Sequence, residues 1–205
     1  SLVGSEMCIR DRQQADKGNI YFEENKIGMS SLDYKKNIGY CPDYPAIFSK
    51  LTVYEHLCFI AALYGIEDKK EVDRIINFYL EHFQLKQYED LLLETLSRGN
   101  QQKVSIVSSL MHNPKLLVYD EPTLGLDPIS LKQFKSVVKK FADNGGTVFL
   151  SSHSLDVIEE IADYVIVIEK GKIIRNSVKV ENIRESLVSI EEYLLTALNE
   201  DEFYE

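Results

Sequence analysis

The chain has 205 residues, of which 44% are apolar and 27% are charged, enough for one substantial globular domain. Its formal net charge is −10 and its lysines and arginines are dispersed, which argues against a nucleic-acid groove or a contact with anionic lipid. No apolar run reaches the roughly 20 residues that cross a bilayer. The three cysteines, Cys8, Cys41 and Cys58, lack metal-ligand spacing, so we expect reduced thiols in a cytoplasmic protein.

The first twelve residues, SLVGSEMCIRDR, differ in character from the rest of the chain. They begin without methionine and show no clear hydrophobic period, so we interpret residues 1–12 as a foreign leader. Residues 16–18 then indicate a turn. In residues 20–23 the apolar Ile20 and Phe22 alternate with polar positions as in a half-buried strand, whose hairpin partner we expect upstream.

A short strand at residues 38–41 precedes a stretch with helical periodicity. The first predicted helix begins at Thr52, which can cap it, and closes at Gly65. A second helix is predicted over residues 72–80 and a third, short one over 88–93. These helices form an insertion between strands.

The most informative stretch is KLLVYDEPTLGLDP, residues 115–128. Residues 116–119 are apolar without polar alternation, which is typical of a strand buried on both faces in a parallel sheet. The strand ends on two adjacent carboxylates, Asp120 and Glu121, where open α/β sheets place ligand chemistry. The simpler interpretation of this acidic pair is a solvated strand end.

Further elements surround this central strand. Ser97 opens a helix before it, with apolar residues on one face. The elements predicted after it are a helix from Pro128 capped by Asp127, a strand over 147–151, a helix over 155–161, a hairpin of 164–168 and 172–175 around Lys170-Gly171, and a tail helix over 190–198.

Three segments resemble motifs of ABC-type ATPases, in the order and spacing of that family. LSRGNQQK, residues 96–103, is similar to the signature motif, LLVYDE is similar to Walker B, and SSHS, residues 151–154, is similar to the switch-histidine motif. The resemblance runs from about Gly18 to Gly171. It implies an α/β, P-loop NTPase-like fold with a three-layer core and a helical subdomain, incomplete at the N-terminus.

The same resemblance implies the domain organisation. We expect a partial ABC ATPase domain at residues 13–175, with its helical subdomain at about 51–112, and a C-terminal tail at 176–205. The phosphate-binding Walker A loop of the family, GxxGxGK[ST], does not occur in the 205 residues. We therefore interpret the chain as the C-terminal portion of an ABC ATPase and expect it to be inactive alone.

For hydrolysis, the resemblance assigns three residues. Asp120 would hold Mg²⁺, since a hard cation prefers carboxylate oxygen. Glu121 would be the general base that activates water, and His153 the switch histidine that hydrogen-bonds the γ-phosphate. A structural histidine is the alternative at that position.

The signature resemblance assigns Ser97, Gly99 and Gln101 to nucleotide binding. A helix N-terminus favours a phosphate, and in the family this one binds the nucleotide held by the opposite subunit. Arg98 replaces the usual small residue. The alternative is a capped helix in which serine and glycine serve folding only.

Two aspartates complete the predicted site. Asp127 should cap the following helix and, by resemblance, belongs to the loop that crosses the dimer interface. Asp43 stands where the family usually has the glutamine that senses Mg²⁺ and contacts the membrane partner; a simple turn aspartate is the alternative.

The function implied is an ATP-binding and ATP-hydrolysing subunit that uses ATP and Mg²⁺ to energise an ABC membrane transporter, of export type. Its partners would be a transmembrane permease subunit and a second ATPase subunit, as a homo- or heterodimer, with no nucleic acid and no membrane span of its own. It would be peripheral on the inner face of the cell membrane. The alternatives are a nonhydrolytic regulatory pseudo-subunit that only dimerises, and a soluble ABC ATPase of translation or DNA repair.

Overall fold

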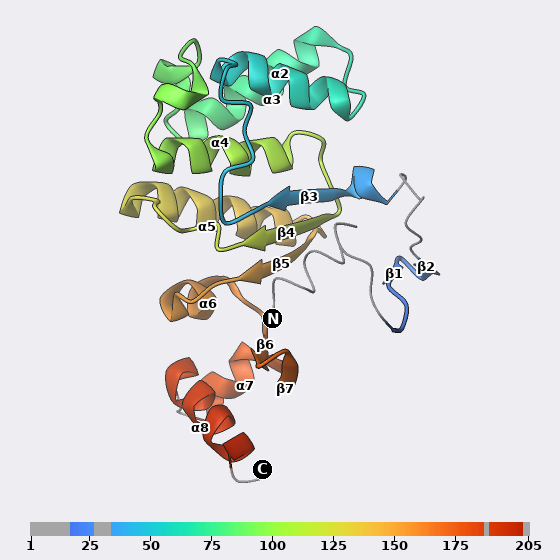
Figure 1. The fold of residues 1–205 in the computed structure, drawn as a ribbon, viewed down its shortest axis with the longest axis vertical. Helices are drawn as coiled ribbons and strands as arrows, with labels where there is room; N and C mark the ends of the chain where they lie inside the picture. The colour runs from blue at the N-terminus through green and yellow to red at the C-terminus, as the bar shows by residue number, and fades with distance from the viewer. Residues whose placement is uncertain (1–16, 27–33, 187–188, 203–205) are drawn as a thin grey trace. The chain divides into compact units, whose positions relative to one another are not determined.

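The chain divides into two compact units. The structure, a computed structural model, describes residues 17–26, 34–186 and 189–202 (Figure 1). Of the described residues, 17–26 and 34–151 belong to the larger unit, and 152–186 and 189–202 belong to the smaller unit. The segment interpreted as a leader lies outside the described residues.

A parallel sheet organises the larger unit. Its strands are β3 (Ile38–Cys41), β4 (Leu116–Asp120) and β5 (Thr147–Ser151), in the order β3-β4-β5. The pairing of β4 with β5 places Asp120 directly opposite Ser151. The three residues before Asp120 are fully buried, so the predicted parallel strand with its acidic end is confirmed.

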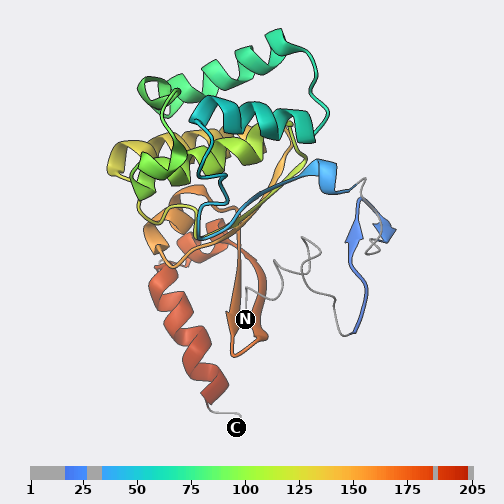
Figure 2. The same cartoon turned by 45° about the horizontal axis from the view of Figure 1, so that its top comes forward.

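Two helices cover the same face of this sheet. The connections from β3 to β4 and from β4 to β5 progress in one direction, so right-handed crossovers place α4 (Arg98–Leu110) and α5 (Pro128–Asp143) together (Figure 2). Tyr119 of β4 contacts both helices, because its hydroxyl lies 2.8 Å from Ser109 Oγ and its ring 5.8 Å from the ring of Phe134. The central strand is thereby held between its neighbours and both helices.

The predicted helical insertion packs on α4. Its helices are α2 (Val53–Leu63) and α3 (Lys69–His82). Thr52 caps α2 in a capping box, in which its hydroxyl accepts a hydrogen bond from Glu55 N–H and the Glu55 carboxylate accepts one from Thr52 N–H. The insertion buries a fully inaccessible set of apolar side chains: Leu57, Ala61, Ile76, Leu80, Phe83, Leu85 and Leu93.

The prediction of a third helix over residues 88–93 is wrong. The structure has two 3₁₀ turns there, η2 (Lys86–Tyr88) and η3 (Leu93–Thr95). Between them the backbone pairs with the segment that enters α2; Val53 N–H, for example, donates to the Leu91 carbonyl at 3.2 Å. Because these backbone groups bond to a distant segment, they cannot form the i→i−4 bonds of an α-helix.

The first strand also differs from expectation. β1 (Tyr21–Phe22) pairs with β2 (Asn25–Lys26), immediately downstream rather than upstream. The two intervening residues, Glu23 and Glu24, have φ of 48° and 65°, as a two-residue hairpin turn requires. A 3₁₀ turn, η1 (Lys35–Asn37), precedes β3.

The smaller unit has a core of its own. It contains α6 (Leu155–Ile161), β6 (Tyr164–Glu169), β7 (Lys172–Lys179), α7 (Val180–Glu185) and α8 (Ile190–Glu202). The predicted hairpin is confirmed, with Lys170 and Gly171 at φ of 46° and 79°. The core of the smaller unit contains a cluster of five buried side chains: Val165, Val167, Val180, Ile183 and Ile190. None of the helices in the described part of the chain is long and apolar enough to cross a membrane.

Two histidines of the larger unit are held neutral by their surroundings. His56 of α2 is fully buried, and its Nε2 lies 3.0 Å from Ser108 Oγ. Because Ser108 donates its own proton to the Val104 carbonyl at 2.8 Å, the imidazole must donate to Ser108, which leaves Nδ1 unprotonated. His112 Nε2 likewise donates to the Ile38 carbonyl at 3.1 Å. In the described part of the chain, neither Nδ1 has a hydrogen-bond partner.

We expect stability to fall as the pH drops from about 7 towards 4. Burial lowers the pKa of His56 and of His112 from 6.5 to about 4. Between these values the unfolded chain binds more protons than the folded one. At pH 5 this difference lowers the free energy of unfolding by roughly 2 kcal/mol per histidine. Urea unfolding at pH 7 and pH 5 measures the loss, and the double variant H56Q/H112Q should lose less. An equal loss in both proteins would contradict this assignment.

Candidate functional site

The two predicted carboxylates lie at the carboxyl end of β4. Asp120 is the last residue of the strand, and Ser151 Oγ donates a hydrogen bond to its Oδ1 at 2.7 Å. A single short bond from a neighbouring strand therefore fixes the orientation of this carboxylate. Both residues belong to the larger unit.

Glu121 has a left-handed backbone, with φ of 46°. This conformation costs a non-glycine residue roughly 1–2 kcal/mol and persists where the surroundings impose it. Here Glu121 N–H lies 3.2 Å from both the carbonyl and the hydroxyl oxygen of Ser151, and the Glu121 carbonyl accepts a hydrogen bond from Leu124 N–H at 3.1 Å. The side chain is therefore presented by a constrained turn directly after the sheet.

The signature-like segment forms the first turn of α4. Ser97 is its N-cap, and its hydroxyl accepts a hydrogen bond from Asn100 N–H at 3.3 Å. Gly99 meets the acidic turn, since a Cβ placed on it would lie 2.6 Å from the Gly125 carbonyl oxygen. Gly99 and Gly125 are 26 positions apart in the sequence, and the structure brings their backbones into contact.

Two further side chains in the first turn of α4, those of Gln101 and Arg98, contact other segments of the larger unit. Gln101 Nε2 donates to the Leu93 carbonyl at 2.9 Å, so its amide is held by the helical insertion. The guanidinium carbon of Arg98 lies 5.9 Å from the centre of the Tyr44 ring, within cation–π range. Tyr44 follows the exposed Asp43. The start of α4 is thus linked to the segment that carries Asp43.

Asp127 caps α5, as predicted. It accepts hydrogen bonds from Ile129 N–H and Ser130 N–H, each at 3.0 Å, and from Ser130 Oγ at 2.7 Å. The Ser130 hydroxyl is the largest cause that lowers the pKa of Asp127. The cap is confirmed, and the role of Asp127 at a dimer interface stays a prediction.

His153 falls in the smaller unit. It is exposed and lies two residues beyond the end of β5, in a turn where Ser154 N–H donates to Ser152 Oγ at 3.1 Å. The larger unit holds every other predicted site residue. The convergence of His153 with the two carboxylates stays a prediction.

The donor set at β4 fits a magnesium ion. Mg²⁺ keeps several waters and is usually bound through one or two carboxylates together with substrate phosphates. Asp120 supplies one oriented carboxylate at the open end of the strand. A closed cage of three or more His, Cys, Asp or Glu side chains does not occur among the described residues, and a phosphate-bound magnesium does not require one.

The sequence interpretation missed two residues at this site. Ser151 orients Asp120, and Gln102 donates to the Pro122 carbonyl of the acidic turn at 3.3 Å. Aligning the ends of the two predicted parallel strands would have placed Ser151 beside Asp120. Gln102 lies one helical turn after Gly99, but the sequence does not indicate a partner for its amide.

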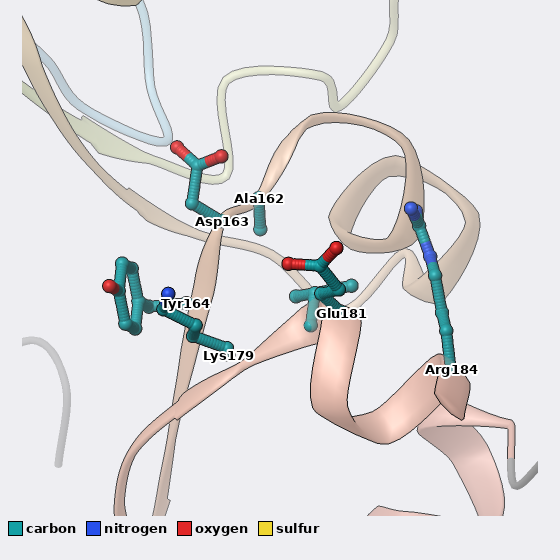
Figure 3. Close-up of a pocket in the computed structure, with 7 residues that line it drawn as sticks. Ala162, Asp163, Tyr164, Lys179, Glu181 and Arg184 are labelled. Atoms are coloured by element: carbon teal, nitrogen blue, oxygen red, sulfur yellow. The ribbon is translucent and has the colours of Figure 1, made fainter. Parts of the chain in front are cut away.

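A pocket of about 310 Å³ in the smaller unit lies outside these motifs (Figure 3). It combines both signs of charge with an aromatic ring, and Lys179 Nζ lies 6.0 Å from the centre of the Tyr164 ring. The lining residues are Ala162, Asp163, Tyr164, Lys179, Val180, Glu181 and Arg184. It shares no residue with the predicted nucleotide-binding motifs.

Comparison with known proteins decides the family. The ABC transporter family model matches residues 6–124, more than half of the chain. The chain belongs to the ABC transporter family. The match begins within the segment interpreted as a leader and includes the signature-like and acidic motifs.

Curated ABC relatives are similar over most of the chain. An uncharacterized ABC transporter ATP-binding protein, YhaQ of Bacillus subtilis, is 36% identical over 66% of this chain and 45% of its own length. The SkfA peptide export ATP-binding protein SkfE, also of Bacillus subtilis, is 32% identical over 82% of this chain and 70% of its own length. The chain spans about half the length of the first curated relatives it matches.

A solved ABC structure shows the same fold. The ATP-binding subunit of an ABC transporter superposes with a TM-score of 0.86 at 25% identity, over 95% of this chain and 82% of that one. The α/β, P-loop NTPase-like fold that the motifs implied is confirmed, with its parallel sheet and helical subdomain.

Proposed function

We propose that this ABC protein is the ATP-hydrolysing subunit of an export-type membrane transporter, held at the inner face of the cell membrane by a transmembrane permease. The observation that carries the proposal is the constrained turn of Asp120 and Glu121 at the end of β4, in backbone contact with the signature-like start of α4. The peptide-export relative supports the export type.

Three residues would act on the terminal phosphate. When bound, Mg²⁺ would neutralise phosphate charge, and Asp120 would hold it through water. Glu121 would accept a proton from the attacking water as general base. His153 would donate a hydrogen bond to the γ-phosphate.

A second subunit would complete the mechanism. Ser97, Gly99 and Gln101 would contact the nucleotide held by that subunit, which requires Gln101 to exchange its bond to the Leu93 carbonyl. Asp127 would lie at the interface between the subunits. Asp43, exposed beside Tyr44, would sense Mg²⁺ and the permease.

The 205 residues contain no GxxGxGK[ST] loop. By itself the chain is therefore proposed to bind ATP weakly at its own site, while it still offers Ser97 and Gly99 to the nucleotide of a partner. The alternative function, a regulatory subunit that dimerises without hydrolysis, differs in what it predicts for turnover.

Removal of magnesium tests the proposal. A form of the protein that carries a GxxGxGK[ST] loop, assembled with its permease and a second copy of itself in lipid vesicles, should release phosphate from ATP. EDTA should reduce the rate to background and excess Mg²⁺ should restore it, because hydrolysis needs the ion at Asp120. The 205-residue chain alone serves as the low-activity control. An assembled complex without Mg²⁺-dependent hydrolysis would favour the regulatory alternative.

A further inference from the structure

A buried glutamine joins α4 to the acidic turn. Only 1% of the Gln102 surface is exposed. Its Nε2 donates to the Pro122 carbonyl oxygen at 3.3 Å and to Cys41 Sγ at 3.6 Å. Pro122 directly follows Glu121 and is itself buried, so its carbonyl cannot readily exchange this bond for one to water. Cys41 ends β3, so Gln102 contacts both the end of β3 and the turn that follows β4.

Gln102 and Gly99 both meet this turn from α4. Gly99 precedes Gln102 by three residues, so both lie on one face of the helix. Gly99 meets the Gly125 carbonyl, and Gln102 meets the Pro122 carbonyl. The turn that begins at Glu121 therefore rests on α4 at both of its ends, and a shift of α4 must move it.

The turn needs such support because its first residue is strained. Glu121 has φ of 46°, its N–H is held by Ser151, and its carbonyl by Leu124. Gln102 holds the next carbonyl along the chain. Without that donor a buried carbonyl would be unpaired, and the turn would be free to relax towards a right-handed backbone. That change would move the Glu121 side chain.

We propose that Gln102 is a positioning residue that fixes the left-handed turn at Glu121 to α4, so that the placement of the general base follows the signature-like helix. The positional part depends only on the contacts above. The catalytic part rests on the proposed function.

Hydrogen exchange of the 205-residue chain tests the positional part. Gln102→Met keeps the length of the side chain and removes the amide. The amides of Glu121 and Leu124 should exchange at least about tenfold faster in this variant, while those within β4 keep their rates. Gln133→Met is the matched control, since Gln133 is partly buried on α5 and its Oε1 has no hydrogen-bond partner among the described residues. Unchanged exchange in the turn, or equal acceleration in the control, would overturn the proposal.

A measurement on the unaltered chain keeps the proposal testable if Gln102→Met does not fold. The side-chain amide protons of Gln102 should exchange at least about tenfold more slowly than those of the exposed Gln87. Equal rates would show that the Gln102 amide is not held, which would overturn the proposal.

The catalytic part is tested in the assembled transporter, with a form of the protein that carries a GxxGxGK[ST] loop. Gln102→Met should lower kcat for ATP about tenfold with KM unchanged, because the base is misplaced while nucleotide contacts remain. Its Tm should stay close to that of Gln133→Met, which should retain kcat. A change in KM alone would overturn the catalytic part. If the unaltered complex hydrolyses no ATP, the proposed function fails, and the exchange result still decides the positional part.

Discussion

In a form of the protein that carries a GxxGxGK[ST] loop, Glu121→Gln is expected to slow ATP hydrolysis by the assembled transporter about 10²- to 10⁴-fold, the usual contribution of a general base. Glutamine has nearly the same size and backbone preferences as glutamate, so the left-handed turn held by Ser151 should be retained. Only the ability to accept a proton from water is lost. ATP should therefore still bind and remain unhydrolysed.

Phosphate release and retained nucleotide should be measured together for this variant. The control is Glu81→Gln, which removes a carboxylate from the exposed side of α3, far along the chain from the acidic turn. It should hydrolyse ATP at the unaltered rate. If Glu121→Gln retains full hydrolysis, Glu121 is not the base and the assignment of this turn is wrong.

Gly39→Ala is expected to destabilise the larger unit by about 3 kcal/mol, at the upper end of the usual cost of overpacking. Gly39 lies in β3, where α4 approaches the sheet. An added Cβ would overlap the Ser109 carbonyl oxygen and lie 2.7 Å from Leu117 Cδ2. Neither helix backbone nor central strand can yield easily, so the two layers must separate.

Urea unfolding measures this loss, and Gly65→Ala is the control. Gly65 has φ of 79° and no atom within 4 Å of an added Cβ, so its substitution costs backbone strain alone, about 1 kcal/mol. The difference between the two variants isolates the overlap between β3 and α4. Equal losses would mean that the helix and sheet are less closely packed than the structure shows.

Local rules predicted much of this fold. Thr52, Ser97 and Asp127 each begin a helix as their side chains indicate, because a cap bonds to amides only two or three residues away. The apolar run ending at Asp120 became the central strand, because successive side chains point to opposite faces of a sheet and residues 117–119 are buried on both.

Features that depend on distant partners were not predictable in this way. Residues 88–93 have helical spacing, yet their backbone bonds to the entrance of α2, and periodicity carries no information about such pairing. The left-handed backbone of Glu121 has the same origin, since Ser151 imposes it from another strand. The role of Gln102 became visible only once α4 lay beside the acidic turn.

The close approach of Gly99 to Gly125 also explains which substitutions in the signature-like segment this fold tolerates. The side chain at position 98 projects towards Tyr44, where there is room for arginine. At position 99 any side chain would collide with the main chain of Gly125. Substitutions are therefore tolerated at position 98 and excluded at position 99. A replacement of Gly99 would need a compensating change in the loop at Gly125.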